Sequence, residues 1–303
     1  MLNRRNFLKQ ASVLMAGGVV GSSILTACSG GGTKTAAPSA EPSVAKKHIG
    51  LQLYSLRDDV KELGIKKVLE IVAEMGYVNL ETAGYSDGLI YEMEPREFKK
   101  IVDDLGMKVT SAHLGREITN DRDADRAWWN KATEAHAAAG MKYMVMPWAP
   151  LEGEGATLDN VKRYGEYFSS IGLITASSSI TFGYHNHAFE FKNKIDDVPV
   201  YDLLMEHTSP RHVIFQNDVY WTQIGGYDPV EYMKKYPNRI KLLHIKDEKA
   251  IGVSGNMDFK AIFDQAYENN VKDWYVEVED YDGTPQEDVK KSYDFLAAAD
   301  YVK

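Results

Sequence analysis

Four apolar stretches of this chain end in side chains that bind metal ions or carry protons. They span residues 183–187, 216–218, 243–247 and 275–279, and each reaches its His, Asp or Glu near its end. Strands of a parallel barrel are buried and apolar along most of their length, and their carboxyl ends open into the functional site. The pattern therefore predicts a parallel barrel with its chemistry at the carboxyl ends of these strands.

An alternation of strand-like and helix-like segments supports the same fold. Residues 65–75 place apolar side chains on one helical stripe, and Pro95 stands where a helix can begin. Eight such units favour an α/β fold of the (β/α)8 TIM-barrel class. The predicted strands cover residues 48–54, 77–82, 108–113, 143–147, 180–185, 213–218, 240–245 and 274–279.

The first 27 residues are typical of an export signal rather than of a folded domain. Arg4 and Arg5 precede an apolar stretch, as in a twin-arginine signal peptide. Residues 25–28 look like a bacterial lipobox, which implies cleavage before Cys28 and lipidation of that residue. An uncleaved membrane anchor is the alternative. Either way we expect the protein to be periplasmic and lipid-anchored or otherwise tethered to a bacterial membrane.

After the export signal, the sequence predicts a flexible tether and then one domain. Residues 28–47 are rich in Gly, Ser, Ala, Pro and Thr and are expected to be flexible. Removing 47 of the 303 residues leaves 256, close to the roughly 250 of one TIM barrel. We therefore expect one catalytic domain over residues 48–303. Because Cys28 is the only cysteine, this domain has neither a disulfide nor a cysteine nucleophile.

Charge narrows the class of partner. The formal net charge is −9, whereas proteins that bind nucleic acid usually carry a basic face. We therefore expect a small-molecule carbohydrate and no nucleic acid as the partner. The membrane is contacted through the lipid anchor only.

The ends of the predicted domain resemble a known enzyme family. Residues 50–57 (Gly-Leu-Gln-Leu-Tyr-Ser-Leu-Arg) and 291–296 (Lys-Ser-Tyr-Asp-Phe-Leu) bound a region similar to the sugar phosphate isomerase/epimerase family of xylose isomerase-like barrels. The resemblance implies one divalent metal at the carboxyl ends of strands five to eight. It places metal ligands at Asp218, His244 and Glu277, and a fourth within residues 185–187.

The residue types agree with such a metal. A mixed shell of imidazole and carboxylate suits Mn, Zn, Co or Fe(II), with Mn or Zn as the first expectation. His185 and His187 share one face of a strand. We favour His187 as the ligand and His185 as a neighbour that carries protons, but the reverse assignment and a core role for both remain open. Glu279 is likewise an alternative to Glu277.

One departure from the family pattern bears on the reaction. Sugar epimerases of this family place glutamates on strands five and eight as two proton carriers, whereas strand five here offers histidine. Elimination or hydration next to a carbonyl is therefore favoured over two-base epimerisation. The expected base is Glu277, His185 or Glu190. Lys246 is expected to stabilise a developing oxyanion.

Other polar and aromatic residues at strand ends are expected to line the substrate site. They are Glu81, His113, Trp148 and Trp221. An ion pair between Glu81 and Lys246 and core packing of either tryptophan are the alternatives.

Together these features predict a metal-dependent sugar isomerase or epimerase, or a lyase or hydratase. We expect it to act on a keto-sugar or a 3-keto-glycoside in carbohydrate breakdown. The alternative is a tethered sugar-binding protein, without activity, on the same barrel.

Overall fold

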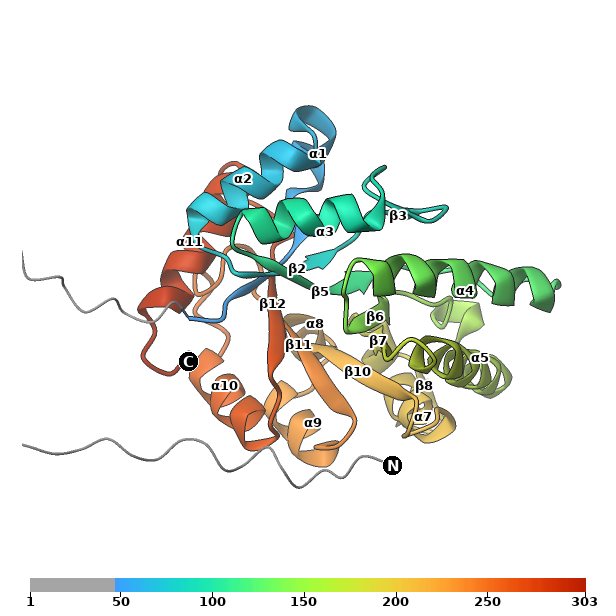
Figure 1. Ribbon diagram of the computed structural model, residues 1–303. Helices are drawn as coiled ribbons and strands as arrows, with labels where there is room; N and C mark the ends of the chain where they lie inside the picture. Colours follow the sequence, from blue (N-terminus) through green and yellow to red (C-terminus); the bar gives the residue numbers. More distant parts are fainter. Residues whose placement is uncertain (1–46) are drawn as a thin grey trace, which may run out of the picture. The chain divides into compact units, whose positions relative to one another are not determined.

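The computed structural model describes residues 47–303 (Figure 1). The expected signal peptide, the lipidation site at Cys28 and nearly all of the expected tether lie outside the described residues. Within residues 47–303, none of the helices combines the length and apolar character needed to cross a membrane.

Eight parallel strands close into a barrel, as the sequence predicts (Figure 1). Their order around the ring is β1-β12-β11-β10-β7-β6-β5-β2. The strands are β1 (Gly50–Gln52), β2 (Asn79–Thr82), β5 (Lys108–His113), β6 (Tyr143–Met146), β7 (Thr181–His185), β10 (Val213–Asp218), β11 (Ile240–Lys246) and β12 (Asp273–Glu277). β5 and β10 have the predicted bounds. β1 is shorter than expected because residues 53–56 form a 3-10 helix, η1 (Leu53–Leu56), whose first turn is capped by Gln52.

Helices surround the barrel and cover its outer face (Figure 1). The longer ones are α1 (Arg57–Leu63), α2 (Ile65–Met75), α3 (Pro95–Asp104), α4 (Arg122–Ala138), α5 (Leu158–Ala176), α7 (Val200–His207), α9 (Pro229–Lys235), α10 (Phe259–Glu268) and α11 (Pro285–Ala298). The predicted apolar stripe of α2 is buried, and Pro95 begins α3 as expected. A large apolar core lies between the strands and these helices.

Short elements follow several strands at their carboxyl ends. They are the hairpins β3 (Tyr85–Ser86) with β4 (Leu89–Ile90) and β8 (Lys194–Ile195) with β9 (Val198–Pro199), the helices α6 (Phe189–Lys192) and α8 (Val219–Ile224), and the 3-10 helix η2 (Gly153–Gly155). α6 and α8 begin within a few residues of the ends of β7 and β10. They therefore fix the direction in which the last side chains of those two strands point.

The inside of the barrel has a small apolar cluster of its own. It consists of Val145, Leu242 and Tyr275, which are fully buried. The hydroxyl of Tyr275 lies 2.7 Å from that of Thr110. These three side chains fill the barrel beneath the polar side chains at its carboxyl end.

Candidate functional site

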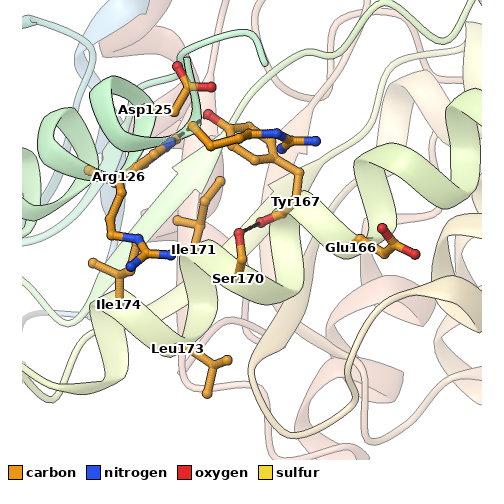
Figure 2. Close-up of a pocket in the computed structure, with 10 residues that line it drawn as sticks. Asp125, Arg126, Glu166, Tyr167, Ser170, Ile171, Leu173 and Ile174 are labelled. Atoms are coloured by element: carbon orange, nitrogen blue, oxygen red, sulfur yellow. Dashed lines mark hydrogen bonds between the residues drawn. The ribbon is translucent and has the colours of Figure 1, made fainter. Parts of the chain in front are cut away.

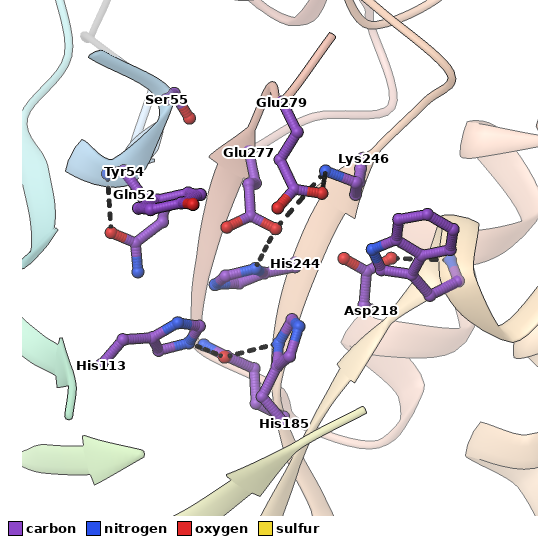
Figure 3. Close-up of polar contacts among 12 residues, drawn as sticks. Gln52, Tyr54, Ser55, His113, His185, Asp218, His244, Lys246, Glu277 and Glu279 are labelled. Atoms are coloured by element: carbon purple, nitrogen blue, oxygen red, sulfur yellow. Dashed lines mark hydrogen bonds and ion pairs between the residues drawn. The ribbon is translucent and has the colours of Figure 1, made fainter. Parts of the chain in front are cut away.

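Four adjacent strands each place one metal-binding side chain at the carboxyl end of the barrel. His185 ends β7, Asp218 ends β10, and His244 and Glu277 lie near the ends of β11 and β12. One donor atom from each of the four lies within 4.8 Å of the others. Figure 3 shows His244 between Glu277 and the pair formed by His113 and His185. The four side chains, which we call the ligand cluster, are at most 4% exposed.

Asp218 has one carboxylate oxygen that the protein does not satisfy. Its Oδ1 accepts a hydrogen bond of 2.8 Å from the backbone N–H of Trp221, which caps α8. Its Oδ2 is buried and has no hydrogen-bond partner among the described residues. Burial raises the pKa of Asp218 to about 7, because an unpaired buried charge is costly. A cation next to Oδ2 would remove that cost.

His244 lies between two carboxylates. Its Nδ1 is 3.1 Å from Oε2 of Glu277, and its Nε2 is 2.5 Å from Oε1 of Glu81. Burial alone would lower the pKa of His244, but the two carboxylates raise it to about 10. When Nε2 donates to Glu81, the second proton at Nδ1 occupies the position that a metal ion can take instead. The donor set therefore fits a divalent cation.

Gln216, which the sequence analysis did not single out, sets the orientation of two histidines. Its Nε2 donates to both carboxylate oxygens of Glu81 at 3.2 and 2.9 Å. Its Oε1 therefore faces Nε2 of His113 at 2.6 Å and Nδ1 of His185 at 3.1 Å. An amide oxygen only accepts, so both nitrogens carry a proton. The lone pair of neutral His185 is consequently on Nε2, which is left for the cluster.

Glu81 lies beneath the ligand cluster rather than on the wall of a cavity. It is fully buried, and it accepts hydrogen bonds from Gln52, Ser111, Gln216 and His244. Burial raises the pKa of Glu81, but its histidine neighbours lower it more, so that the net shift is downward. The sequence analysis expected Glu81 to contact the sugar. In the structure Glu81 instead binds His244 directly and fixes Gln216, which orients the other two histidines.

A cavity of about 400 Å³ opens above the cluster. Of the predicted site residues, His113, Trp148, His185, His187 and Glu277 line it. The remaining lining residues are Tyr54, Ala83, Leu114, Pro147 and Glu279. The cavity therefore joins the buried cluster to a partly exposed aromatic rim.

His187 lies on the cavity wall, outside the group of four cluster residues. Its ring stacks on Phe189 with centroids 5.9 Å apart and lies 6.0 Å from the ring of Trp221. Its Nδ1 is buried without a hydrogen-bond partner among the described residues. Burial lowers the pKa of His187, so the ring is neutral at pH 7. The structure thus brings His185 into the ligand cluster, where the sequence analysis favoured His187.

Lys246 forms ion pairs beside the cluster. Its Nζ lies 2.6 Å from Oε2 of Glu279 and 3.6 Å from Oε2 of Glu277. The ammonium is 5.7 Å from the ring centroid of Trp221, whose indole N–H is buried without a partner in the described part of the chain. Burial would lower the pKa of Lys246, but the surrounding carboxylates raise it. Lys246 therefore stays positively charged, and its partner is Glu279 rather than Glu81.

Glu190 lies in α6 and holds the turn that follows β7. It is fully buried, and it accepts hydrogen bonds from the hydroxyl of Tyr184 at 2.7 Å and from the backbone N–H of His187 at 2.8 Å. Burial raises the pKa of Glu190 to about 8. The residue does not line the 400 Å³ cavity. Its contacts fix the backbone from which His187 projects.

A second cavity, of about 590 Å³, lies on the outside of the barrel between α4 and α5 (Figure 2). Its lining includes Asp125, Arg126, Trp129, Tyr167 and Leu173. Asp125 is buried and accepts hydrogen bonds from Arg116 and Thr119. None of the residues that the sequence predicted for the site lines this cavity.

Comparisons with known proteins agree with the fold. The family model described as xylose isomerase-like TIM barrel matches residues 69–299, which contain all four cluster residues. A solved sugar phosphate isomerase/epimerase from Parabacteroides distasonis ATCC 8503 is 37% identical; the alignment covers 87% of this chain and 98% of that chain with a TM-score of 0.79.

Two further comparisons are with enzymes that are named for other sugar reactions. Inosose dehydratase of Geobacillus kaustophilus (strain HTA426) is 27% identical over 232 residues, which is 68% of this chain and 71% of the relative. A solved 3-keto-D-glucoside 4-epimerase from E. coli is 19% identical, covers 77% of this chain and 93% of that chain, and has a TM-score of 0.61. At that identity the second likeness concerns the fold alone.

Proposed function

Because this chain belongs to the xylose isomerase-like TIM barrel family, we propose that it is a divalent-metal-dependent enzyme that acts on a keto-sugar or a 3-keto-glycoside. Its relatives include sugar isomerases, epimerases and dehydratases, and the chain is an enzyme of that superfamily. Within this range we propose a lyase or hydratase reaction next to a carbonyl.

One observation carries the proposal. Donor atoms of His185, Asp218, His244 and Glu277 lie within 4.8 Å of one another, and Oδ2 of Asp218 has no partner in residues 47–303. We propose these four residues as the ligands, with Mn or Zn as the ion. A divalent cation held there would polarise a ketone and the hydroxyl on the adjacent carbon, which would make the hydrogen on that hydroxyl-bearing carbon easier to remove.

The chain itself supplies the groups that move protons. We propose that His187 accepts the proton, because it lines the cavity, is neutral at pH 7 and has a buried nitrogen without a partner among residues 47–303. We propose that the charged Lys246, which lies beside the cluster but does not line the cavity, favours the negative charge that develops on the carbonyl oxygen without contacting it. Glu190 would act only by fixing the backbone of His187.

The histidine at the end of β7 favours elimination or hydration over epimerisation. Two-base epimerisation needs a proton carrier on each face of the sugar ring. Here β7 ends in His185, whose Nδ1 is bound by Gln216 and whose Nε2 is left for the cluster. One proton acceptor beside the substrate carbonyl matches removal of a single proton, after which the C–O bond on the next carbon breaks and the leaving oxygen takes up the proton from His187.

We propose that the enzyme works outside the cytoplasm, anchored through a lipid on Cys28. The support is the twin-arginine-like start and the lipobox-like sequence before Cys28. Labelling of cells with a radioactive fatty acid, in the wild type and in Cys28→Ser, tests this part of the proposal separately. Absence of label from the wild-type protein would contradict it.

The enzymatic part is tested by metal analysis together with mass spectrometry. Purified protein is incubated with glucosides and with their 3-keto forms, and loss of an aglycone or of water is followed. We expect about one equivalent of metal and turnover that stops when the metal is removed. His244→Ala is expected to lose both metal and turnover, whereas Leu173→Ala, in the outer cavity, keeps both. Turnover that survives complete metal removal would contradict the proposal, and binding of keto-sugars without any product would favour a binding protein.

A further inference from the structure

We propose that the mouth of the barrel carries a second subsite, formed by Tyr54 and Trp148, that holds the aglycone of a glycoside substrate. The inference rests on the proposed function and narrows it from keto-sugars in general to glycosides with a flat, apolar aglycone or a second sugar ring. Both aromatic residues line the 400 Å³ cavity.

The two aromatic residues stand on either side of the ligand cluster. Trp148 follows β6, which neighbours β7 in the ring, and Tyr54 follows β1, which neighbours β12. The four strands that carry the cluster lie between these two neighbours. Figure 3 shows the ring of Tyr54 beside Glu277. A ligand over the cluster is therefore flanked by aromatic rings on both sides.

The ligand cluster is buried, whereas Tyr54 and Trp148 at the rim of the cavity are exposed. Tyr54 is 42% exposed and Trp148 is 38% exposed, whereas the cluster residues are at most 4% exposed. A sugar ring that reaches the cluster is enclosed, so its exposed neighbours contact whatever extends outward from that ring. A cavity of about 400 Å³ falls in the range of roughly 300–1,000 Å³ that holds ligands of drug size. A single sugar ring is smaller than such ligands.

Tyr54 is held in place although it is exposed. The guanidinium carbon of Arg57 lies 4.7 Å from its ring centroid. Arg57 in turn donates to the hydroxyl of Tyr281 at 2.9 Å and to the backbone carbonyl of Glu279 at 3.1 Å. A ring that is fixed before binding costs less entropy when a ligand stacks on it. This support is expected for a binding surface and is not needed for a solvent-exposed side chain.

The chemistry of the rim selects the class of aglycone. Ring faces of Tyr and Trp bind apolar ring faces, including those of sugars and aryl groups. Pro147 and Leu114 add apolar surface between β5 and β6. An anionic group such as a phosphate is disfavoured here, because no lysine or arginine within residues 47–303 lines the cavity to pair with it.

The test compares two substrates that differ only in the aglycone. KM is measured for methyl and 4-nitrophenyl 3-keto-D-glucosides, both anomers of each, with manganese-loaded and zinc-loaded protein. We expect the wild type to prefer the nitrophenyl compound, and Tyr54→Ala and Trp148→Ala each to reduce that preference about 2- to 10-fold. Tyr54→Phe and Trp148→Phe keep a ring and are expected to keep most of the preference. Leu173→Ala, in the outer cavity, leaves it unchanged.

Two outcomes overturn the subsite, and they are distinct from failure of the proposed function. The subsite is wrong if the wild type converts both glycosides with equal KM, or if the preference survives in the Tyr54→Ala/Trp148→Ala double variant. Circular dichroism and metal content of each variant identify a change in folding. If the wild type converts neither glycoside with either metal, the subsite fails, whereas the proposed function fails only if free keto-sugars are not converted either.

Discussion

Two cavities of this protein, one on the outside of the barrel and one at its mouth, differ in size and in how well their polar groups are satisfied. The outer cavity between α4 and α5, at about 590 Å³, is larger than the mouth cavity, at about 400 Å³. Asp125 beside the outer cavity is bound by Arg116 and Thr119. At the barrel mouth, by contrast, Asp218 and His187 each keep a buried polar atom without a partner in residues 47–303. The unsatisfied polar atoms at the barrel mouth, and not its volume, distinguish this cavity from the outer one.

The largest contrast is expected between two buried aspartates, one from each region. Asp218→Asn still caps α8, because an amide oxygen accepts the N–H of Trp221, but it removes a charge from the cluster. We expect it to lose metal and turnover without lowering the stability of the metal-free protein at pH 8, since burial raises the pKa of Asp218 to about 7. Metal content, turnover and thermal unfolding are measured.

Asp125→Asn is the matched variant of the outer region. It weakens a charge-assisted pair with Arg116, and we expect a loss of about 1–3 kcal/mol in the free energy of unfolding with metal content and turnover unchanged. The comparison breaks down if Asp125→Asn loses metal, or if Asp218→Asn retains it.

His187→Ala is expected to separate binding from chemistry. If His187 is the proton acceptor, turnover falls about 10²- to 10⁴-fold while metal content stays near that of the wild type. Elemental analysis and single-turnover measurements check both quantities. Loss of metal in this variant would instead show that His187 is the ligand, as the sequence analysis favoured.

Gln216→Leu is expected to weaken metal binding about 10- to 100-fold, the range for partners that orient a ligand. The substitution removes the acceptor that fixes the Nδ1–H form of His185. ¹⁵N spectra of the metal-free protein should show His185 as Nδ1–H in the wild type and as a mixture in the variant. Gln265→Leu, at a buried glutamine of α10, is the control. Unchanged spectra and affinity in Gln216→Leu would contradict the assignment.

Another expected effect concerns Glu190 and the pH dependence of stability. Burial raises its pKa from 4.5 to about 8 in the folded protein, so the folded state binds a proton that the unfolded state has released between these values. The contribution to stability is complete below pH 4.5 and is lost as pH rises to about 8. Glu190→Gln should therefore show a flatter fall in unfolding free energy over this range, measured by urea titration. Parallel curves for the two proteins would refute the shift.

Much of this site follows from sequence pattern because it is built from strand ends. The family resemblance implied Asp218, His244 and Glu277 as ligands, and the rule that polar residues after a buried strand lie at one end of a barrel agrees with that assignment. That rule cannot decide which of two residues on the same strand face, here His185 and His187, is the ligand. β7 ends at His185, and the turn that Glu190 holds directs His187 to the wall of the mouth cavity. The strand pattern contains no information about that turn.

The residues that pattern reasoning missed act through contacts distant in sequence. Gln216 and Asp218 share one strand face, so the spacing alone offered a signal for Gln216. Its role depends on Glu81 from β2, which is 135 residues away. The expected sugar contact of Glu81 was a reasonable inference from its strand end. Glu81 lies buried beneath His244 only because the eight strands close into a barrel, which the strand pattern of β2 alone does not indicate.

The link between Glu81 and His244 joins positions 163 residues apart. All four proposed ligands come from the later half of the polypeptide, but the acceptor that orients His244 comes from its early part. A truncated chain that lacks β2 would keep the four proposed ligands but lose the acceptor that orients the imidazole of His244. Tight binding of the cation would then indicate that the eight-stranded barrel has closed. A probe that detects the bound metal could follow this last step of folding.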